Sequence, residues 1–144
     1  MKRTTTTILV AVLSVAMLSA RNFSDDISAP PAAVEATFNQ MYPYAERVEW
    51  EREHGRYEAE FYLGDTEKEA LFKADGTWIR TKTEISPAEA PTDAVQAVKA
   101  KYPQWVIDDI DFYEDASLGE YYLIEIERGS LDKHVKVRAD GTML

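Results

Sequence analysis

The sequence predicts an α+β fold in which a helix and a four-stranded antiparallel meander occur twice in tandem. Two short helical patterns each end in a Tyr-Pro pair, Tyr42-Pro43 and Tyr102-Pro103. Each is followed by segments that alternate apolar and charged residues, the period of a half-buried strand. Each unit also closes with the same turn, Ala74-Asp75-Gly76-Thr77 and Ala139-Asp140-Gly141-Thr142. Asp-Gly favours hairpins because glycine adopts the positive φ that such turns require.

The first repeat covers residues 29–81 and begins with an amphipathic helix. Pro31 suits the first helical turn, where the backbone N–H has no partner in any case. Val34, Phe38 and Met41 follow at the spacing of one helical face, and Pro43 ends the helix. This pattern predicts a helix that buries one apolar stripe.

Four strands are expected after this helix. Trp50 lies on the first strand and His54-Gly55 forms the turn. Tyr57, Ala59 and Phe61 alternate with charged residues along the second strand and should face the helix. Ala70 and Phe72 do the same on the third strand, and residues 77–81 form the fourth.

The second repeat covers residues 91–144 and follows a polar linker at residues 82–90. Its helix matches the first at a shift of 60 residues, and its later strands match at a shift of 65, so the five extra residues fall near 114–119. The inward positions correspond, since Phe61 matches Ile126 and Phe72 matches Val137. We expect the two meanders to join edge to edge into one continuous curved sheet, with both helices on one face, because joining removes an exposed edge.

The first twenty residues have the features of a Sec-type signal peptide. Lys2 and Arg3 precede an apolar stretch at residues 8–18, which is too short to span a bilayer as an ordinary helix. Residues 21–28 form a polar tail. The chain has no cysteine, so lipoprotein processing is excluded. We expect a periplasmic or secreted protein whose mature chain does not insert into a membrane.

The amino-acid composition argues against several classes of function. The net charge of −10 argues against nucleic acid, which requires clustered cations. The absence of cysteine excludes thiolate metal sites and cysteine nucleophiles. His54 and His134 are the only histidines, and they are not equivalent in the two repeats. With no nucleophile–base spacing and no glycine-rich phosphate loop, we predict no catalytic residue and no cofactor. A small hydrolase is the least supported class.

These motifs resemble those of the PepSY-like family of periplasmic proteins, known from Bacteroides-type bacteria. The resemblance rests on the helix with its Tyr-Pro end, Trp50, the strand containing Tyr57, and Asp75-Gly76-Thr77-Trp78, with the pattern repeated across residues 28–144. It implies a fold similar to that of the β-lactamase-inhibitor protein, an exported location and no established enzymatic activity. In that inhibitor the concave sheet face grips a protein partner.

Two surfaces are candidate binding sites. The sheet face opposite the helices should expose a mixture of apolar, aromatic and charged side chains suited to a protein or peptide partner, namely Tyr62, Leu71, Ile79, Tyr113, Leu123, His134 and Lys136. These can equally be ordinary surface residues, or be covered by the linker or a second copy. The alternative function is a calcium-responsive regulator that uses the acidic run Asp109, Asp111, Glu114 and Asp115, although the run lacks the order of an EF-hand.

Overall fold

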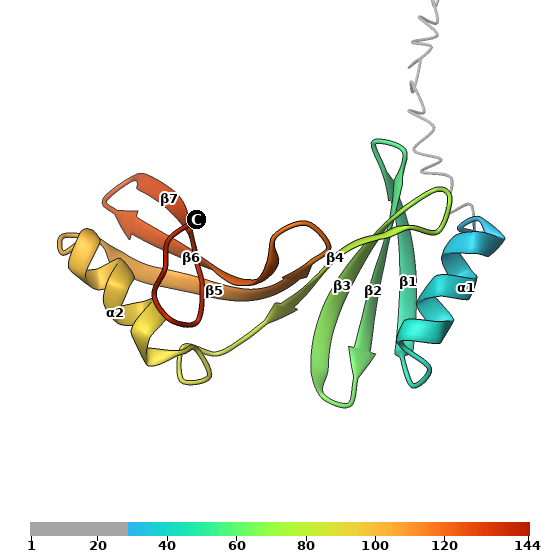
Figure 1. Ribbon diagram of the computed structural model, residues 1–144, viewed down its shortest axis with the longest axis horizontal. Coiled ribbons are helices and arrows are strands. Elements are labelled where there is room, and N and C mark those ends of the chain that lie inside the picture. Colours follow the sequence, from blue (N-terminus) through green and yellow to red (C-terminus); the bar gives the residue numbers. More distant parts are fainter. Residues whose placement is uncertain (1–28) are drawn as a thin grey trace, which may run out of the picture.

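The computed structural model describes residues 29–144, which contain two helices and seven strands (Figure 1). The strands form one sheet in the order β1 to β7, and each is antiparallel to the next. The signal peptide and polar tail predicted for residues 1–28 lie outside the described residues. The elements are α1 (Ala32–Met41), β1 (Glu46–Glu53), β2 (Arg56–Leu63), β3 (Thr66–Lys73), β4 (Trp78–Glu84), α2 (Thr92–Lys101), β5 (Val106–Asp115), β6 (Gly119–Arg128) and β7 (Leu131–Val137).

Local sequence explains where these elements begin and end. Pro31 and Pro91 directly precede the helices. After the last turn of α1 the Tyr42 N–H donates to the Phe38 carbonyl, and Pro43 prevents a further turn. Between β1 and β2, His54 and Gly55 both have positive φ, 49° and 77°. Two such residues are what a tight hairpin of the right twist requires.

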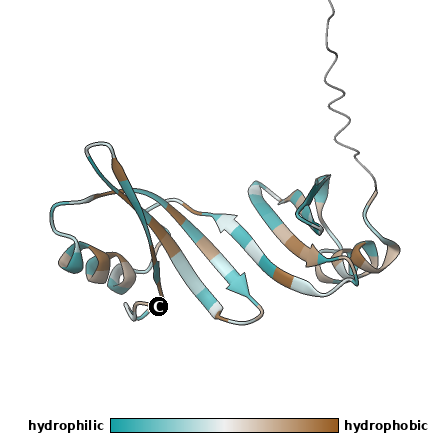
Figure 2. Cartoon of the chain, turned by 90° about the horizontal axis from the view of Figure 1, so that it is seen from above, coloured by the Kyte–Doolittle hydropathy of each residue, from teal (hydrophilic) through white to brown (hydrophobic). Residues whose placement is uncertain are grey.

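Each half of the molecule has its own hydrophobic core between helix and sheet. In the first half Phe38 of α1 packs on Phe61 and Phe72, with ring centroids 5.0 and 6.3 Å away. In the second half Val98 of α2 packs among aliphatic side chains that include Ile126 and Val137. The inward positions predicted on the strands are thus confirmed, and so are Val34 and Phe38 on α1, whereas Met41 of the predicted stripe is exposed. Figure 2 shows the corresponding hydrophobic bands crossing the strands.

The two halves join through β4 and β5. Thr81 pairs with Glu114, Thr83 with Phe112 and Glu84 with Asp111, so residues 82–84 belong to the sheet. Thr81 is fully buried on the helix side, where its hydroxyl shares a 2.5 Å hydrogen bond with the Tyr42 hydroxyl. Because pairing preserves the side of each residue, the α1 side of β4 continues into the α2 side of β5. Both helices therefore lie on one face of one sheet, as predicted.

The predicted fourth strand of the second repeat is only a bridge. After β7 the chain turns at Asp140 and Gly141, and Met143 forms an isolated bridge with Val137. The Arg138 N–H donates to the Thr142 carbonyl at 2.8 Å, and the Leu144 N–H to the Lys136 carbonyl at 3.0 Å. The four strands predicted for this repeat are therefore not confirmed, since β5, β6 and β7 are followed by this bridge alone within residues 29–144.

Both Asp-Gly turns lie against the helix of their own half. In each, the aspartate side chain accepts the backbone N–H of the threonine two residues later at 2.9 Å, which fixes the turn. A Cβ placed on Gly76 would lie 2.5 Å from the Ala33 carbonyl oxygen, and one on Gly141 would lie 3.0 Å from that of Asp93. The duplicated turn is thus a contact point between sheet and helix.

The sheet bends at the β4–β5 joint. In Figure 1 the strands of the two halves run in different directions, α1 and α2 lie on the outer sides, and the helix-free faces meet on the inner side. The side of the sheet opposite the helices is therefore concave. We call it the concave face.

Candidate functional site

The strand register places charged and aromatic residues in rows across the concave face. One row contains Glu60, Glu69, Lys82, Tyr113 and Tyr121 on successive strands. A second row runs from Glu84 through Asp111 and Leu123 to Lys136. Glutamates dominate the part contributed by the first half, namely Glu49, Glu51, Glu58, Glu60, Glu67 and Glu69. Tyr62 and Leu71 also lie on this part of the face, and the second half contributes Tyr113, Tyr121 and Leu123.

A pair of stacked tyrosines forms the centre of this face. The rings of Tyr113 and Tyr121 are 5.0 Å apart and within 4° of parallel. The Arg80 guanidinium lies over Tyr113 at 5.5 Å, and the Lys136 ammonium lies over Tyr121 at 5.0 Å. Such cation–π contacts are worth about 0.5–2 kcal/mol each, more where water is excluded. The tyrosines and the two cations therefore form one packed unit on the side without helices.

This packing corrects part of the sequence prediction. Leu71 and Tyr113 were expected to be exposed, yet they are only 4% and 8% accessible, and Tyr121 only 2%. They are on the predicted side of the sheet, but Arg80 pairs with Leu71 and its guanidinium lies over the Tyr113 ring. Tyr121 was missed, although it shares the strand phase of Leu123 and could have been found from that alternation.

Other predicted residues differ in position and exposure. Tyr62 is half-buried, donates to Glu67 Oε2 at 2.5 Å, and has the Arg47 guanidinium 5.3 Å from its ring centre. His134 is exposed, with Nε2 3.5 Å from Glu125 Oε2, and Lys136 is exposed as well.

Ile79 does not occupy the place on the concave face that alternation gave it. It is the extra residue of a β-bulge, and Arg80 lies opposite Leu71 instead. The Ile79 carbonyl accepts the Ala116 N–H from the β5–β6 turn at 2.9 Å. The bulge therefore ties this turn to β4 at the bend, and it adds a cation to the face where an apolar residue was expected.

A charged cluster adjoins the tyrosines. Lys82 Nζ lies 2.8 Å from Glu69 Oε1 on the neighbouring strand. Burial raises the pKa of the Asp111 carboxyl to about 6, even though Lys82 nearby opposes the shift. Asp111 Oδ1 is buried and has no hydrogen-bond partner within residues 29–144. A carboxylate so placed is costly to ionise.

This cluster makes the stability of the protein depend on pH. The pKa of Asp111 is higher in the folded chain than in the unfolded chain, where it is about 3.9. The folded state therefore holds this proton more tightly, and the resulting stability is present below pH ~4 and lost as pH rises through ~6. We expect Asp111→Asn to gain stability relative to the wild type across that window. Urea unfolding of both proteins as a function of pH measures it, and a constant difference between them would contradict the assignment.

The four residues of the calcium alternative do not converge. Asp109, Asp111 and Asp115 share the concave face, but Glu114 pairs with Thr81 and so lies on the helix side. Its charge raises the pKa of Tyr42 there, after the larger effect of burial. Within residues 29–144 no group of three or more His, Asp or Glu side chains is arranged to hold a metal ion. Alternation puts Glu114 on the opposite side, and a rise of about 3.3 Å per residue along β5 keeps Asp109, Asp111 and Asp115 apart.

Comparison with known proteins agrees with this geometry. The profile of a family described as beta-lactamase-inhibitor-like and PepSY-like matches residues 16–64 and 55–144. The chain belongs to the PepSY-like family. No protein of curated function is detectably similar to it.

Solved structures similar to this PepSY-like protein come from several Bacteroides species. A DUF2874 family protein from Bacteroides ovatus is 26% identical with a TM-score of 0.72, and the match covers 80% of this chain and 84% of that one. A BLIP-like protein from Bacteroides fragilis is 25% identical with a TM-score of 0.72, covering 80% and 83%. A protein from Bacteroides eggerthii described as periplasmic has the same fold at 18% identity and a TM-score of 0.71, covering 80% and 86%. The PepSY-like chain thus has a BLIP-like fold.

Each of the two helices described in the PepSY-like protein has 10 residues. Neither α1 nor α2, the helices within residues 29–144, has the length and apolar character needed to cross a bilayer.

Proposed function

We propose that this PepSY-like protein is an exported, non-enzymatic binding protein that holds a protein or peptide partner on its concave face. The observation that carries the proposal is the concave face itself, a seven-stranded surface on the side of the sheet opposite both helices. The BLIP-like fold supports an inhibitor-like role, and the periplasmic description of the Bacteroides eggerthii neighbour supports export.

The composition of the face suits recognition of a protein. Binding surfaces commonly combine an aromatic or apolar centre with a polar rim. Here the packed tyrosines supply a rigid platform, half-buried Leu123 and Tyr62 supply contact area, and the glutamates of β1–β3 surround them. A rigid platform lowers the entropy lost when a partner docks.

The test uses residues of the face that are not part of its packed centre. Tyr62→Ala combined with Leu123→Ala should weaken capture of the partner at least about tenfold, because two large side chains in contact with the partner are lost together. The tagged mature protein is used to capture partners from an extract of the host's exported proteins, and the affinity of the captured partner is measured by calorimetry. Tyr113 is left intact because its burial would confuse binding with stability.

The matched control is Tyr44→Ala. Tyr44 is 84% exposed in the turn after α1, outside the sheet, so its removal should leave capture unchanged. Thermal unfolding should show equal stability for all variants. Full capture by the Tyr62/Leu123 variant would refute the assignment of the concave face.

A further inference from the structure

The second half has a groove on its helix side, between the C-terminal end of α2 and the start of β5. Its volume is about 600 Å³. Its lining is largely apolar and includes Val95, Tyr102, Trp105 and Ile107. Val106 at its edge is 71% exposed, which is unusual for a valine.

The duplication explains why the groove exists in this half. In the first half the ring of Trp50 lies 5.2 Å from that of Phe38 and fills space between sheet and helix. The matching residue of the second half is Ile110, which pairs with Ile124 as Trp50 pairs with Ala59, and Ile110 lines the groove. The smaller side chain leaves apolar surface that the second half does not fill itself.

Positive charge gathers around this groove. The Lys133 ammonium lies 5.0 Å from the ring centre of Tyr102 and 5.2 Å from that of Trp105. The Arg128 guanidinium lies 5.2 Å from Trp105, and the Lys101 ammonium 5.7 Å from Tyr102. Among residues 29–144 none of these cations has a carboxylate oxygen within 4.0 Å. They lie over aromatic rings instead.

Strand alternation separates this charge from the acidic residues nearby. Lys133 pairs with Ile126, whose side chain is in the core under α2, so Arg128 and Lys133 share the helix side. Glu127 and Asp132 pair with each other on the opposite side. In a chain with a net charge of −10, this end of the helix side is therefore locally basic.

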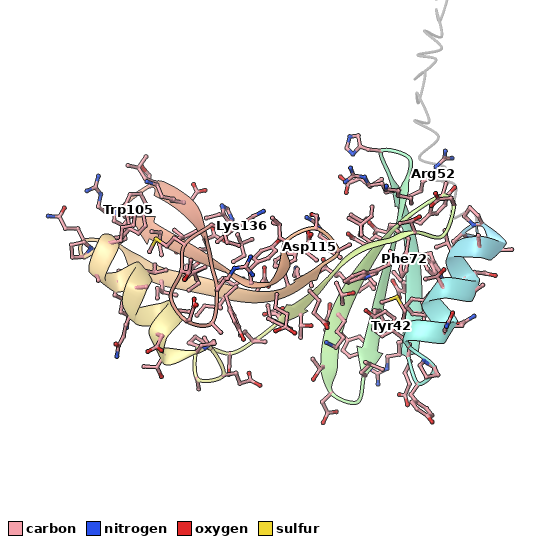
Figure 3. All side chains as sticks on the ribbon, in the orientation of Figure 1. Tyr42, Arg52, Phe72, Trp105, Asp115 and Lys136 are labelled. Atoms are coloured by element: carbon pink, nitrogen blue, oxygen red, sulfur yellow. The ribbon has the colours of Figure 1, made fainter. Side chains whose placement is uncertain are left out.

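We propose that this groove is a second docking site, which binds an acidic segment of a partner protein through one aromatic or aliphatic side chain. The apolar side chain enters beside Trp105 and Ile107, while carboxylates next to it pair with Lys133 and Arg128. Charge complementarity selects an acidic segment, because the groove repels a basic one. The site is independent of the concave face, since Trp105 lies near the outer end of the second half and Asp115 at the bend (Figure 3).

The test measures binding of a dye-labelled acidic peptide that carries one phenylalanine between aspartates and glutamates. Fluorescence anisotropy with the mature protein should show saturable binding that weakens at high salt. Lys133→Glu combined with Arg128→Glu should reduce the affinity at least about tenfold, as loss of close charge pairs does. A peptide with alanine in place of phenylalanine should bind as weakly.

Two controls separate the groove from general charge effects. Arg56→Glu combined with Lys73→Glu makes the same change in net charge at exposed sites in the first half and should leave the affinity unchanged. The Tyr62/Leu123 variant should also bind the peptide normally, so failure of the concave-face proposal and failure of this one are distinguishable.

Four outcomes would overturn the proposal. The first is unchanged affinity for the acidic peptide in the Lys133/Arg128 variant. The second is equal affinity for a peptide that has lysines in place of its acidic residues. The third is that the protein binds anionic lipid vesicles and does not bind the peptide. The fourth is a concentration-dependent dimer that the Lys133/Arg128 variant abolishes, which would show that a second copy fills the groove.

Discussion

Replacing Phe61 with alanine will lower the free energy of unfolding by about 3–5 kcal/mol, the range for removing a fully buried phenylalanine. Phe61 has no accessible surface, and its ring lies 5.0 Å from that of Phe38 and 4.6 Å from that of Tyr42. Both neighbours are fixed, since Phe38 is on α1 and the Tyr42 hydroxyl is bonded to Thr81. The vacated space cannot close easily, so the cost should fall near the upper end. Urea unfolding at equilibrium measures it.

The control for this prediction is Ile126→Val at the matching position of the second half. Ile126 is also buried, but the change removes one methylene and should cost about 0.5–1.5 kcal/mol. A loss below about 1 kcal/mol for Phe61→Ala would mean that the aromatic cluster is not closely packed.

Replacing Gly76 with alanine will destabilise the protein by about 2–5 kcal/mol, through backbone strain and overpacking together. Gly76 has a φ of 87°, which side chains with a Cβ rarely adopt. The new methyl group would also lie 2.5 Å from the Ala33 carbonyl oxygen and 2.9 Å from its carbon. These are backbone atoms, so α1 itself must shift away from the turn. Thermal and urea unfolding report the loss.

Other glycines provide a graded series for the same substitution. Gly64 also has positive φ, but nothing lies within 4 Å of its added Cβ, so Gly64→Ala isolates the strain of the backbone. Gly141 is intermediate, with the Asp93 carbonyl oxygen at 3.0 Å. The expected order of destabilisation is Gly76, then Gly141, then Gly64. Equal losses at all three would show that contact with the helices contributes nothing.

Much of the fold could be predicted because the sequence contains the same pattern twice, and the two copies can be compared with each other. Two copies of one pattern identify the inward positions twice, and the matching residues Phe72 and Val137 are both fully buried, as predicted. The same reasoning predicted one joined sheet with both helices on one side. It could not give the extent of β4, because residues 82–84 are polar and become a strand through pairing with β3 and β5.

The site was less predictable because alternation gives the side of a residue and not its exposure. Leu71 and Tyr113 are buried although they lie on the side without helices, where Arg80 pairs with Leu71 and lies over the Tyr113 ring. The bulge at Ile79 places Arg80 there, where an apolar residue was expected. The groove of the second half depends on how the end of α2 lies on β5, which the sequence alone does not give.

The order of the strands affects how fast, and in which order, the protein folds. Every strand pairs with its neighbour in sequence, so most pairings close short loops and folding should be fast for a protein rich in β-structure. The fully buried apolar residues of the first core belong to α1, β2 and β3, and Trp50 of β1 and Trp78 of β4 pack against them. As the chain emerges with its N-terminus first, these elements can fold before α2 has been synthesised. The free edge of β4 is then available for pairing with β5.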